Sequence, residues 1–240
     1  MDDLTEPTPE NNKHNLGGTK KLARVQERLV GNLVSYEAEA NGSLFQDIVP
    51  NKYMADTQTS LGSAELEIHT EQAFSNLRPD VISLACLRGD PEAYTHLLPV
   101  ECVIENMSRK EIELLHQPLW KIGVDLSFRC SIDDTERGPI PILYSDGRFV
   151  FDQDLMIGTT PEATRLVQKI VEIYYRHRTS ICLEPGDILV IDNNRVVHGR
   201  SAFRPRFDGY DRFLIRCFGM LDLVKSDYAR EGNMILAKYS

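Results

Sequence analysis

Hydrophobic and polar positions follow two different periods along this chain, and the first is helical. Residues 1–18 are polar, with two prolines and a double glycine, which predicts an N-terminal arm. From residue 19 to residue 38, apolar side chains recur at helical spacing with charged residues between them, at Leu22, Val25, Leu29, Leu33 and Val34. This spacing predicts one amphipathic helix over 19–38.

Further along the chain, the period changes to that of β-strands. In SAELEIHTE, residues 63–71, Leu66 and Ile68 face one side of a predicted strand, whereas His69 and Glu71 face the other. Other stretches with strand character are NGSLFQDIVP (41–50), DVISLACLRG (80–89), RFVFDQDLMIG (148–158), PGDILVID (185–192), RVVHGRSAF (195–203) and DRFLIRCFGML (211–221).

Two further helices are predicted from their N-terminal residues. Ser108 followed by Glu111 has the form of a capping box, and Thr160 with Pro161 suits an N-cap and a first helical position. Many short strands and about three helices predict a mainly β fold, a sandwich or barrel with flanking helices packed outside it. We expect residues 19–240 to form a single domain, since this length supports one sizeable core.

Composition and charge narrow the class of protein. A formal charge of -9 and a sequence pI near 5.2 argue against a general nucleic-acid binder, which is normally basic. No apolar run is long enough to span a bilayer, and no basic-then-apolar start resembles a signal peptide. The five cysteines are widely spaced without a CxxC pair, which favours free thiols in a reducing cytoplasm. We therefore expect a cytoplasmic protein without nucleic-acid or membrane partners.

Three residues carry the candidate metal chemistry. His69 and Glu71 lie two positions apart on a predicted strand, so both side chains can reach one ion. If the strand of His198 lies beside the first, two imidazoles and one carboxylate form the facial triad of non-haem Fe(II) oxygenases. Taken alone, a His-x-Glu pair is more often a pair of solvated surface residues, and a single histidine such as His198 is more often a hydrogen-bonded structural residue than a ligand.

Two arginines lie beyond the distal histidine. Arg212 and Arg216 are in phase on a predicted strand and so point to one face. We expect residues 185–203 and 212–219 to pair as antiparallel strands through the turn-rich segment between them, which would bring Arg212 back towards the metal. Inward-facing arginines need anionic partners, and a carboxylate bound in bidentate fashion is a natural one.

These motifs together resemble a known family. HTEQAF (69–74), PGDILVIDNNRVVHGRSAF (185–203) and DRFLIRCFG (211–219) are similar to Fe(II)/2-oxoglutarate-dependent oxygenases of the clavaminate synthase-like, TauD-related group. Within that group the chain most resembles the hydroxylases of free arginine, lysine or asparagine, over about residues 30–220. The resemblance implies a double-stranded β-helix, or jelly roll, and an enzyme that uses Fe(II), 2-oxoglutarate and O2. Relatives carry a longer N-terminal region than this chain.

The resemblance also implies roles for particular residues. His69, Glu71 and His198 would hold the iron, and Arg212 would bind the distal carboxylate of 2-oxoglutarate. Arg216 matches the arginine that holds the substrate α-carboxylate in relatives. Glu39 and Ser60 fall near family positions that contact the amino-acid head of the substrate.

The substrate side chain is indicated by two acids. Asp152 and Asp154 lie two positions apart in a predicted strand and would clamp a cationic side chain, although an exposed edge strand would place the same acids in solvent. We therefore expect free L-lysine or L-arginine rather than asparagine. The implied reaction hydroxylates an unactivated side-chain carbon and releases succinate and CO2. The turn-rich segment 130–141 is a candidate lid.

Other functions compatible with these residues differ in how they would use the site. A halogenase normally lacks the carboxylate ligand, so Glu71 argues against halogenation. A desaturase would share every residue named above, and a non-catalytic jelly-roll binding module would keep the metal ligands without needing Arg212. A zinc hydrolase lacks further support, because no HExxH spacing is present. The desaturase and the binding module stay open at this point, and the sequence does not indicate an oligomeric state.

Overall fold

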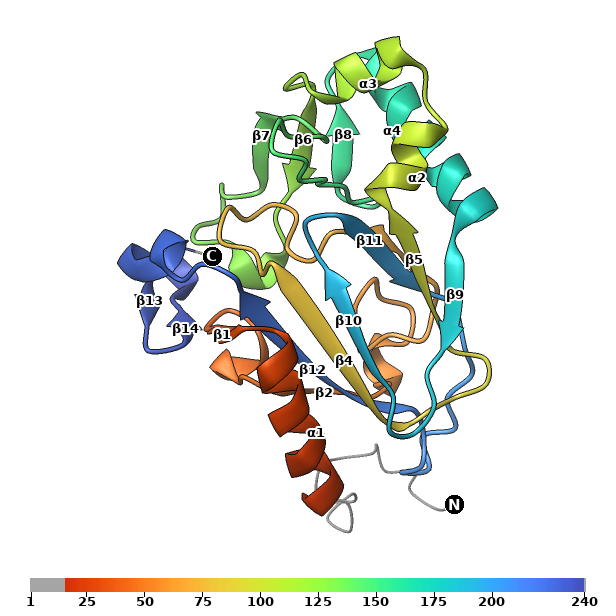
Figure 1. Ribbon diagram of the computed structural model, residues 1–240, viewed down its shortest axis with the longest axis vertical. Coiled ribbons are helices and arrows are strands. Elements are labelled where there is room, and N and C mark those ends of the chain that lie inside the picture. The colour runs from red at the N-terminus through yellow and green to blue at the C-terminus, as the bar shows by residue number, and fades with distance from the viewer. Residues whose placement is uncertain (1–15, 240) are drawn as a thin grey trace.

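Two β-sheets face each other in the computed structural model, which describes residues 16–239 (Figure 1). The larger sheet has the order β10-β4-β12-β1-β14-β13, with β2 also paired to β12. Its strands are β1 (Asn32–Tyr36), β2 (Gln46–Ile48), β4 (Val81–Arg88), β10 (Ile188–Asp192), β12 (Phe213–Met220), β13 (Arg230–Glu231) and β14 (Met234–Ile235). The second sheet has the order β3-β11-β5-β9, with β3 (Leu66–His69), β5 (Tyr94–Pro99), β9 (Thr179–Cys182) and β11 (Val196–Arg200).

A third, smaller sheet and most of the α-helices gather at one end of this pair (Figure 1). The small sheet has the order β7-β6-β8, with β6 (Trp120–Gly123), β7 (Glu136–Ile140) and β8 (Met156–Gly158). The α-helices are α1 (Leu16–Leu29), α2 (Val100–Glu105), α3 (Arg109–Leu115) and α4 (Pro161–His177), and the 3-10 helices are η2 (Ala40–Gly42), η3 (Lys52–Met54), η4 (Leu126–Phe128), η5 (Val224–Ala229) and η6 (Ala237–Tyr239). The buried Trp120 indole donates to the Ala163 carbonyl at 3.1 Å and so joins β6 to α4.

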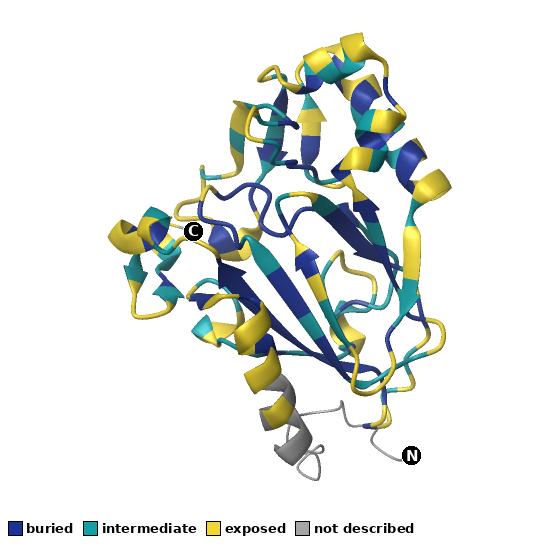
Figure 2. Ribbon diagram, viewed as in Figure 1, coloured by how far each residue is buried: buried dark blue, intermediate teal, exposed yellow. Residues whose placement is uncertain are grey.

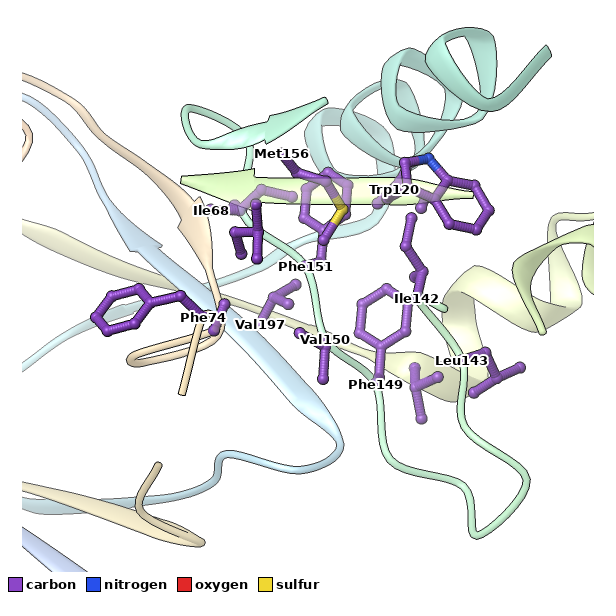
Figure 3. Close-up of a cluster of buried hydrophobic side chains, with 14 of the residues drawn as sticks. Ile68, Phe74, Trp120, Ile142, Leu143, Phe149, Val150, Phe151, Met156 and Val197 are labelled. Carbon is purple, nitrogen blue, oxygen red and sulfur yellow. The ribbon is translucent and has the colours of Figure 1, made fainter. Parts of the chain in front are cut away.

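The buried core follows the strand alternation expected from the sequence. Ile68 and Val197 are fully buried and belong to a cluster with Phe149, Phe151 and Trp120 (Figure 3). The central strands of both sheets are largely buried, whereas α4 exposes its outer face (Figure 2). Burying an aliphatic side chain stabilises a fold by about 1.5–3 kcal/mol, so this cluster fixes the position of the strands that carry the histidines.

The helix starts that were predicted from capping residues are correct. Ser108 and Glu111 form a capping box at the start of α3, and Thr160 accepts a hydrogen bond from Ala163 N at 3.1 Å at the start of α4. Pro161 is the first residue of α4, as expected. The prediction of a mainly β protein with flanking helices is confirmed.

The predicted amphipathic helix over 19–38 is wrong at both ends. The helix starts at Leu16, inside the predicted arm, and ends at Leu29; the rest of the arm lies outside the described residues. Gly31 follows with φ of 77°, a left-handed conformation that favours glycine and stops a helix. Leu33 and Val34 then belong to β1, where they pack into the sheet. The apolar residues of a helix and of a following strand had produced one apparent period.

The predicted pairing of segments 185–203 and 212–219 is also wrong. β11 pairs with β3 and β5, whereas β12 pairs with β1, β2 and β4 in the opposite sheet. The connection between β11 and β12 therefore crosses from one sheet to the other. The arginines reach the same space as the histidines from the facing sheet, not from a neighbouring strand.

The segment 148–158 forms much less strand than predicted. Only Met156–Gly158 is a strand, and Asp152 makes an isolated bridge with His69. The Asp152 carboxylate accepts from the backbone N–H groups of Asp154 and Leu155, at 3.0 and 2.8 Å, which turns the chain at this point. Within residues 16–239, no helix is both long and apolar enough to cross a membrane.

Candidate functional site

A cavity of about 730 Å³ lies between the two large sheets. β2, β4 and β12 contribute to one wall, and β3, β5 and β11 contribute to the other. Every site residue proposed from the sequence lines this cavity: Glu39, Ser60, His69, Glu71, Asp152, Asp154, His198, Arg212 and Arg216. Its volume lies within the range of about 300–1,000 Å³ that is usual for small-molecule sites.

The pairing of β3 with β11 brings the two candidate histidines together. His69 and His198 are direct partners across the antiparallel strands, with ring centroids 4.4 Å apart. Their neighbours Ile68 and Val197 point the other way, into the apolar cluster of Figure 3. Alternation along each strand thus sends one side chain into the core and the next into the cavity.

Glu71 follows β3 and is held through its backbone by a buried asparagine. Asn193 accepts a hydrogen bond from Glu71 N at 2.8 Å and donates to Glu71 O at 3.1 Å. It also donates to the Pro79 carbonyl at 2.8 Å. Because Asn193 is fully buried and these bonds are short, the direction of the Glu71 backbone is fixed.

The three side chains offer a suitable donor set for a divalent metal ion. One ligand atom from each of His69, Glu71 and His198 lies within 4.8 Å of the others. His69 Nδ1 lies 2.9 Å from the Glu67 carbonyl, which can only accept, so Nδ1 carries a proton and, in the neutral ring, Nε2 keeps the lone pair that a metal needs. Two imidazoles and one carboxylate suit non-haem Fe(II), and they leave coordination positions for other ligands.

The charge states of these groups also suit metal binding. Burial, followed by the nearby His69, lowers the pKa of His198 to about 4, so its imidazole is neutral near pH 7. Burial alone would raise the pKa of Glu71, but Arg216 and the two imidazoles outweigh burial and lower this pKa from its ordinary value. Neutral imidazoles and an ionised carboxylate are the forms that bind metals.

Arg212 presents an unpaired cation to the cavity. It immediately precedes β12 and is 5% exposed, and burial lowers its pKa to about 10. Its guanidinium group has no hydrogen-bond or ion-pair partner among residues 16–239. Because a buried unpaired charge is costly, this arrangement favours an anionic ligand at Arg212.

Arg216 lies four residues further along β12 and is already neutralised by acids. It donates to Glu71 Oε1 at 3.1 Å and forms a close ion pair with Glu39. Gln46 Oε1 accepts from two of its nitrogens, at 3.0 and 2.6 Å. Gln72 in turn donates to Glu39 at 3.1 Å. Arg216 thus links the candidate metal ligand Glu71 with Glu39, the acid expected to contact the amino-acid head of the substrate.

The remaining predicted residues lie on loops at the cavity. Ser60 belongs to residues 49–65 between β2 and β3, called here the 49–65 loop. Burial raises the pKa of Asp152 to about 6, and its Oδ2 has no partner in the described part of the chain. Asp154 is exposed at the cavity edge. Asp152 and Asp154 thus line the cavity from a turn, although they do not share a strand face.

Sequence reasoning missed four residues at this site. Thr95 and Asp125 line the cavity from β5 and from the start of η4, Arg200 lines it from β11, and Asn193 holds Glu71. The spacing of Arg200, two positions after His198, could have indicated its direction. The positions of the others depend on pairings between segments far apart in the sequence.

Comparisons with known proteins agree with this geometry. Residues 129–218 match the family described as Taurine catabolism dioxygenase TauD, TfdA family. The chain is 49% identical over 247 aligned residues to L-lysine 3-hydroxylase of Catenulispora acidiphila, an alignment that covers 98% of this chain and 69% of that protein. It is 35% identical to L-asparagine oxygenase of Streptomyces coelicolor, covering 82% of this chain and 60% of that protein.

A solved structure of asparagine oxygenase extends the comparison to three dimensions. The complex with Fe(II), 2S,3S-3-hydroxyasparagine and succinate superposes with a TM-score of 0.81 at 31% identity. The superposition covers 86% of this chain and 66% of that chain, so this chain spans about two thirds of its relatives' length. The likeness confirms the predicted jelly-roll core. The chain therefore belongs to the TauD and TfdA family of Fe(II)- and 2-oxoglutarate-dependent dioxygenases, within the group that acts on free amino acids.

Proposed function

We propose that this protein hydroxylates free L-lysine at C3, with 2-oxoglutarate and O2 as cosubstrates and succinate and CO2 as co-products. His69, Glu71 and His198 hold the iron in this proposal. Bound Fe(II), 2-oxoglutarate and O2 would together supply the oxidising chemistry: O2 is the oxidant, one of its oxygen atoms would replace an unactivated C–H bond by C–OH, and the other would enter succinate as 2-oxoglutarate loses CO2. The protein binds and orients both organic molecules and keeps water from the reacting carbon.

Arg212 holds the distal carboxylate of 2-oxoglutarate. A guanidinium group matches a carboxylate with two parallel hydrogen bonds, and Arg212 has no competing partner among residues 16–239. This contact fixes the cosubstrate at the end of the cavity formed by the start of β12. The 2-oxoacid end can then approach the iron ligands on the facing sheet.

The observation that carries the choice of C3 is the contact between Arg216 and Glu71, at 3.1 Å. Arg216 binds the α-carboxylate of lysine, while Glu39 and Ser60 contact the rest of its amino-acid head. An amino-acid head bound at Arg216 therefore lies beside an iron ligand. C3, the first methylene after the α-carbon, is then the side-chain carbon closest to the oxidant.

Asp152 and Asp154 bind the side-chain ammonium. Asp152 has one oxygen committed to its own turn and one oxygen free for a ligand, and Asp154 adds a second negative charge at the cavity edge. The relative at 49% identity is named for lysine, whereas the one named L-ornithine/L-arginine 3-hydroxylase is 27% identical, which supports lysine over arginine. Charge-assisted hydrogen bonds favour either cation over a neutral amide.

Two further properties belong to the same proposal. We take residues 19–240 as one oxygenase domain, because both walls of the cavity come from segments distributed along this range. A cytoplasmic location fits the five cysteines, all of which are free thiols.

Turnover of position-labelled lysine tests the proposal. Purified protein is incubated with Fe(II), ascorbate, 2-oxoglutarate and air, together with L-lysine that carries deuterium at C3 or at C4. The expected product gains one oxygen, loses deuterium only from the C3-labelled substrate, and forms with an equal amount of succinate. D-lysine and 6-aminohexanoate, which present the head group differently or incompletely, serve as matched controls.

Other products would assign a different reaction or substrate. Loss of two hydrogens without gain of oxygen would assign a desaturase. Deuterium loss from C4 alone would contradict the placement of C3, and faster turnover of L-arginine would contradict the choice of lysine. Binding of lysine without any succinate formation would favour a non-catalytic binding module.

A further inference from the structure

Arg200 lies at the end of β11, where the proposed reaction has not yet given it a role. It follows His198 by two positions, so its side chain points to the same face of the strand and lines the same cavity. It is only 4% exposed. Its guanidinium group therefore lies beside Arg212, the proposed 2-oxoglutarate anchor, and beside the 49–65 loop that carries Ser60.

The contacts of Arg200 tie the 49–65 loop to the strand that carries His198. Nη2 donates to the Ala64 carbonyl at 2.8 Å, and Nη1 donates to the Ser60 carbonyl at 3.3 Å. The first contact has the length of a good hydrogen bond, and the second is longer and weaker. The backbone of Ser60 is therefore held from inside the cavity by Arg200.

Arg200 and Arg212 form a pair of buried cations at the same part of the cavity. Burial and the nearby charge of Arg212 both disfavour the charged form of Arg200. Neither arginine has a carboxylate partner in the part of the chain that the structure describes. Two buried like charges repel each other, and an anion bound between or beside them removes much of this repulsion.

We propose that Arg200 couples the 2-oxoglutarate site to the substrate site. The distal carboxylate of 2-oxoglutarate at Arg212 also stabilises the charge of Arg200, which then holds Ser60 and Ala64 in the position that contacts the substrate. Without the cosubstrate, repulsion from Arg212 weakens these contacts and the 49–65 loop is released. Arg200 is a positioning residue, and its role rests on the substrate and cosubstrate sites proposed above.

Binding measurements without turnover test this coupling. The affinity for L-lysine is measured by calorimetry on Fe(II)-loaded protein without O2, in the presence and absence of 2-oxoglutarate. In the unmodified protein 2-oxoglutarate should tighten lysine binding by a factor of about 5–150, the usual range for coupled sites. In Arg200→Gln this factor should fall to about 1.

Two further variants separate charge from shape. Arg200→Lys keeps a cation near Arg212 but loses the planar fork that reaches two carbonyls, so its 2-oxoglutarate affinity should stay while the coupling factor falls. Arg204→Gln removes the same kind of charge from an exposed position and should leave both quantities unchanged. Thermal unfolding shows whether each variant is folded, and Arg200→Lys carries the test if Arg200→Gln is not.

Limited proteolysis gives a readout that does not need lysine. Lys52 is exposed within η3, inside the 49–65 loop, so trypsin cleavage after Lys52 reports release of this loop. 2-Oxoglutarate should slow this cleavage in the unmodified protein and in Arg204→Gln, but not in Arg200→Gln.

Several outcomes would overturn the inference. Equal lysine affinity with and without 2-oxoglutarate in the unmodified protein would do so, as would an undiminished coupling factor in Arg200→Gln. If the protein binds 2-oxoglutarate but not lysine, the proposed substrate is wrong, and proteolysis then decides the role of Arg200. In that case, equal protection of the 49–65 loop by 2-oxoglutarate in the unmodified protein and in Arg200→Gln would contradict the proposed role of Arg200.

Discussion

The two ends of the cavity are built in different ways. At the metal end, His69 and His198 lie on paired strands, and buried backbone contacts fix the segment that carries Glu71. At the substrate end, Ser60, Asp152 and Asp154 lie on loops and turns. Paired strands hold the metal-binding histidines in a fixed geometry, whereas the sequences of the loops can change without disturbing that geometry. Relatives of this chain are named for lysine and for asparagine, so the part that differs between them includes the substrate site.

The largest effect is expected at the metal end. His198→Ala removes one of three candidate ligands, so bound iron and lysine-dependent succinate formation should both fall to background. Iron content per chain and succinate release measure the two quantities. Exposed His116 provides the control, because His116→Ala removes an imidazole that does not line the cavity and should leave both unchanged. Retention of iron by folded His198→Ala would remove this histidine from the metal site.

The second-largest effect should fall on 2-oxoglutarate binding and leave metal binding intact. Arg212→Leu removes the two charge-assisted hydrogen bonds to 2-oxoglutarate, worth about 1.5–3 kcal/mol, which is about 10- to 100-fold in affinity. Fe(II) binding should remain, since Arg212 contacts no metal ligand. Calorimetric titration with 2-oxoglutarate measures the change. An unchanged dissociation constant would show that another group anchors the cosubstrate.

The third effect belongs to the substrate end alone. Asp152→Asn keeps an oxygen that can accept from Asp154 N and Leu155 N, so the turn should persist while the negative charge is lost. L-lysine affinity should fall by about 10-fold, and the affinities for 2-oxoglutarate and iron should not change. L-norleucine, which lacks the side-chain ammonium, is the matched ligand. Equal losses for lysine and norleucine would place Asp152 outside the ammonium site.

The smallest effect lies outside both ends and concerns stability. Lys169, followed by the backbone N–H of Ser108, lowers the pKa of Glu111 from 4.5 to about 2 in the folded protein. The ionised carboxylate therefore stabilises the fold above about pH 4.5, and this contribution is lost as the pH falls towards 2. Glu111→Gln keeps the capping box but loses the ion pair, which is partly exposed, so it should cost at most about 1 kcal/mol at pH 7.

Unfolding by urea at pH 7 and at pH 3 measures the difference in unfolding free energy between the unmodified protein and Glu111→Gln. This difference should shrink at the lower pH, and Glu111→Gln should turn over lysine at pH 7 as fast as the unmodified protein does. A stability difference that grows on acidification would contradict the assigned ion pair between Glu111 and Lys169.

The contrast between the two ends also explains what the sequence could predict. His69, Glu71 and His198 were identified because their motifs are local in the sequence, although the predicted strand extends too far: β3 ends at His69, and Glu71 lies in the turn after it. Asn193 was not identified as a support for Glu71, because that contact joins residues far apart in the chain. The sheet that contains β12 was also not predictable, since alternation shows which side chains share a face but not which strands pair.

Helix boundaries failed for a local reason. Leu33 and Val34 continue the apolar spacing of the preceding helix, although they belong to β1, and Gly31 is the residue that separates the two elements. Asp152 and Asp154 reached the cavity despite a wrong strand assignment, because a turn stabilised by Asp152 itself brings both to the same place. In both cases backbone hydrogen bonding, which the hydrophobic pattern does not record, decided the local structure.

The ratio of succinate to hydroxylated lysine is the decisive measurement for lysine hydroxylation in this cavity. It is measured at initial rate with Fe(II), 2-oxoglutarate, O2 and L-lysine, and again without lysine. We expect lysine to stimulate succinate formation strongly and one C3-hydroxylated lysine to appear for each succinate. Succinate formation that is independent of lysine, or that yields no hydroxylated lysine, would contradict the assignment of this cavity to lysine hydroxylation.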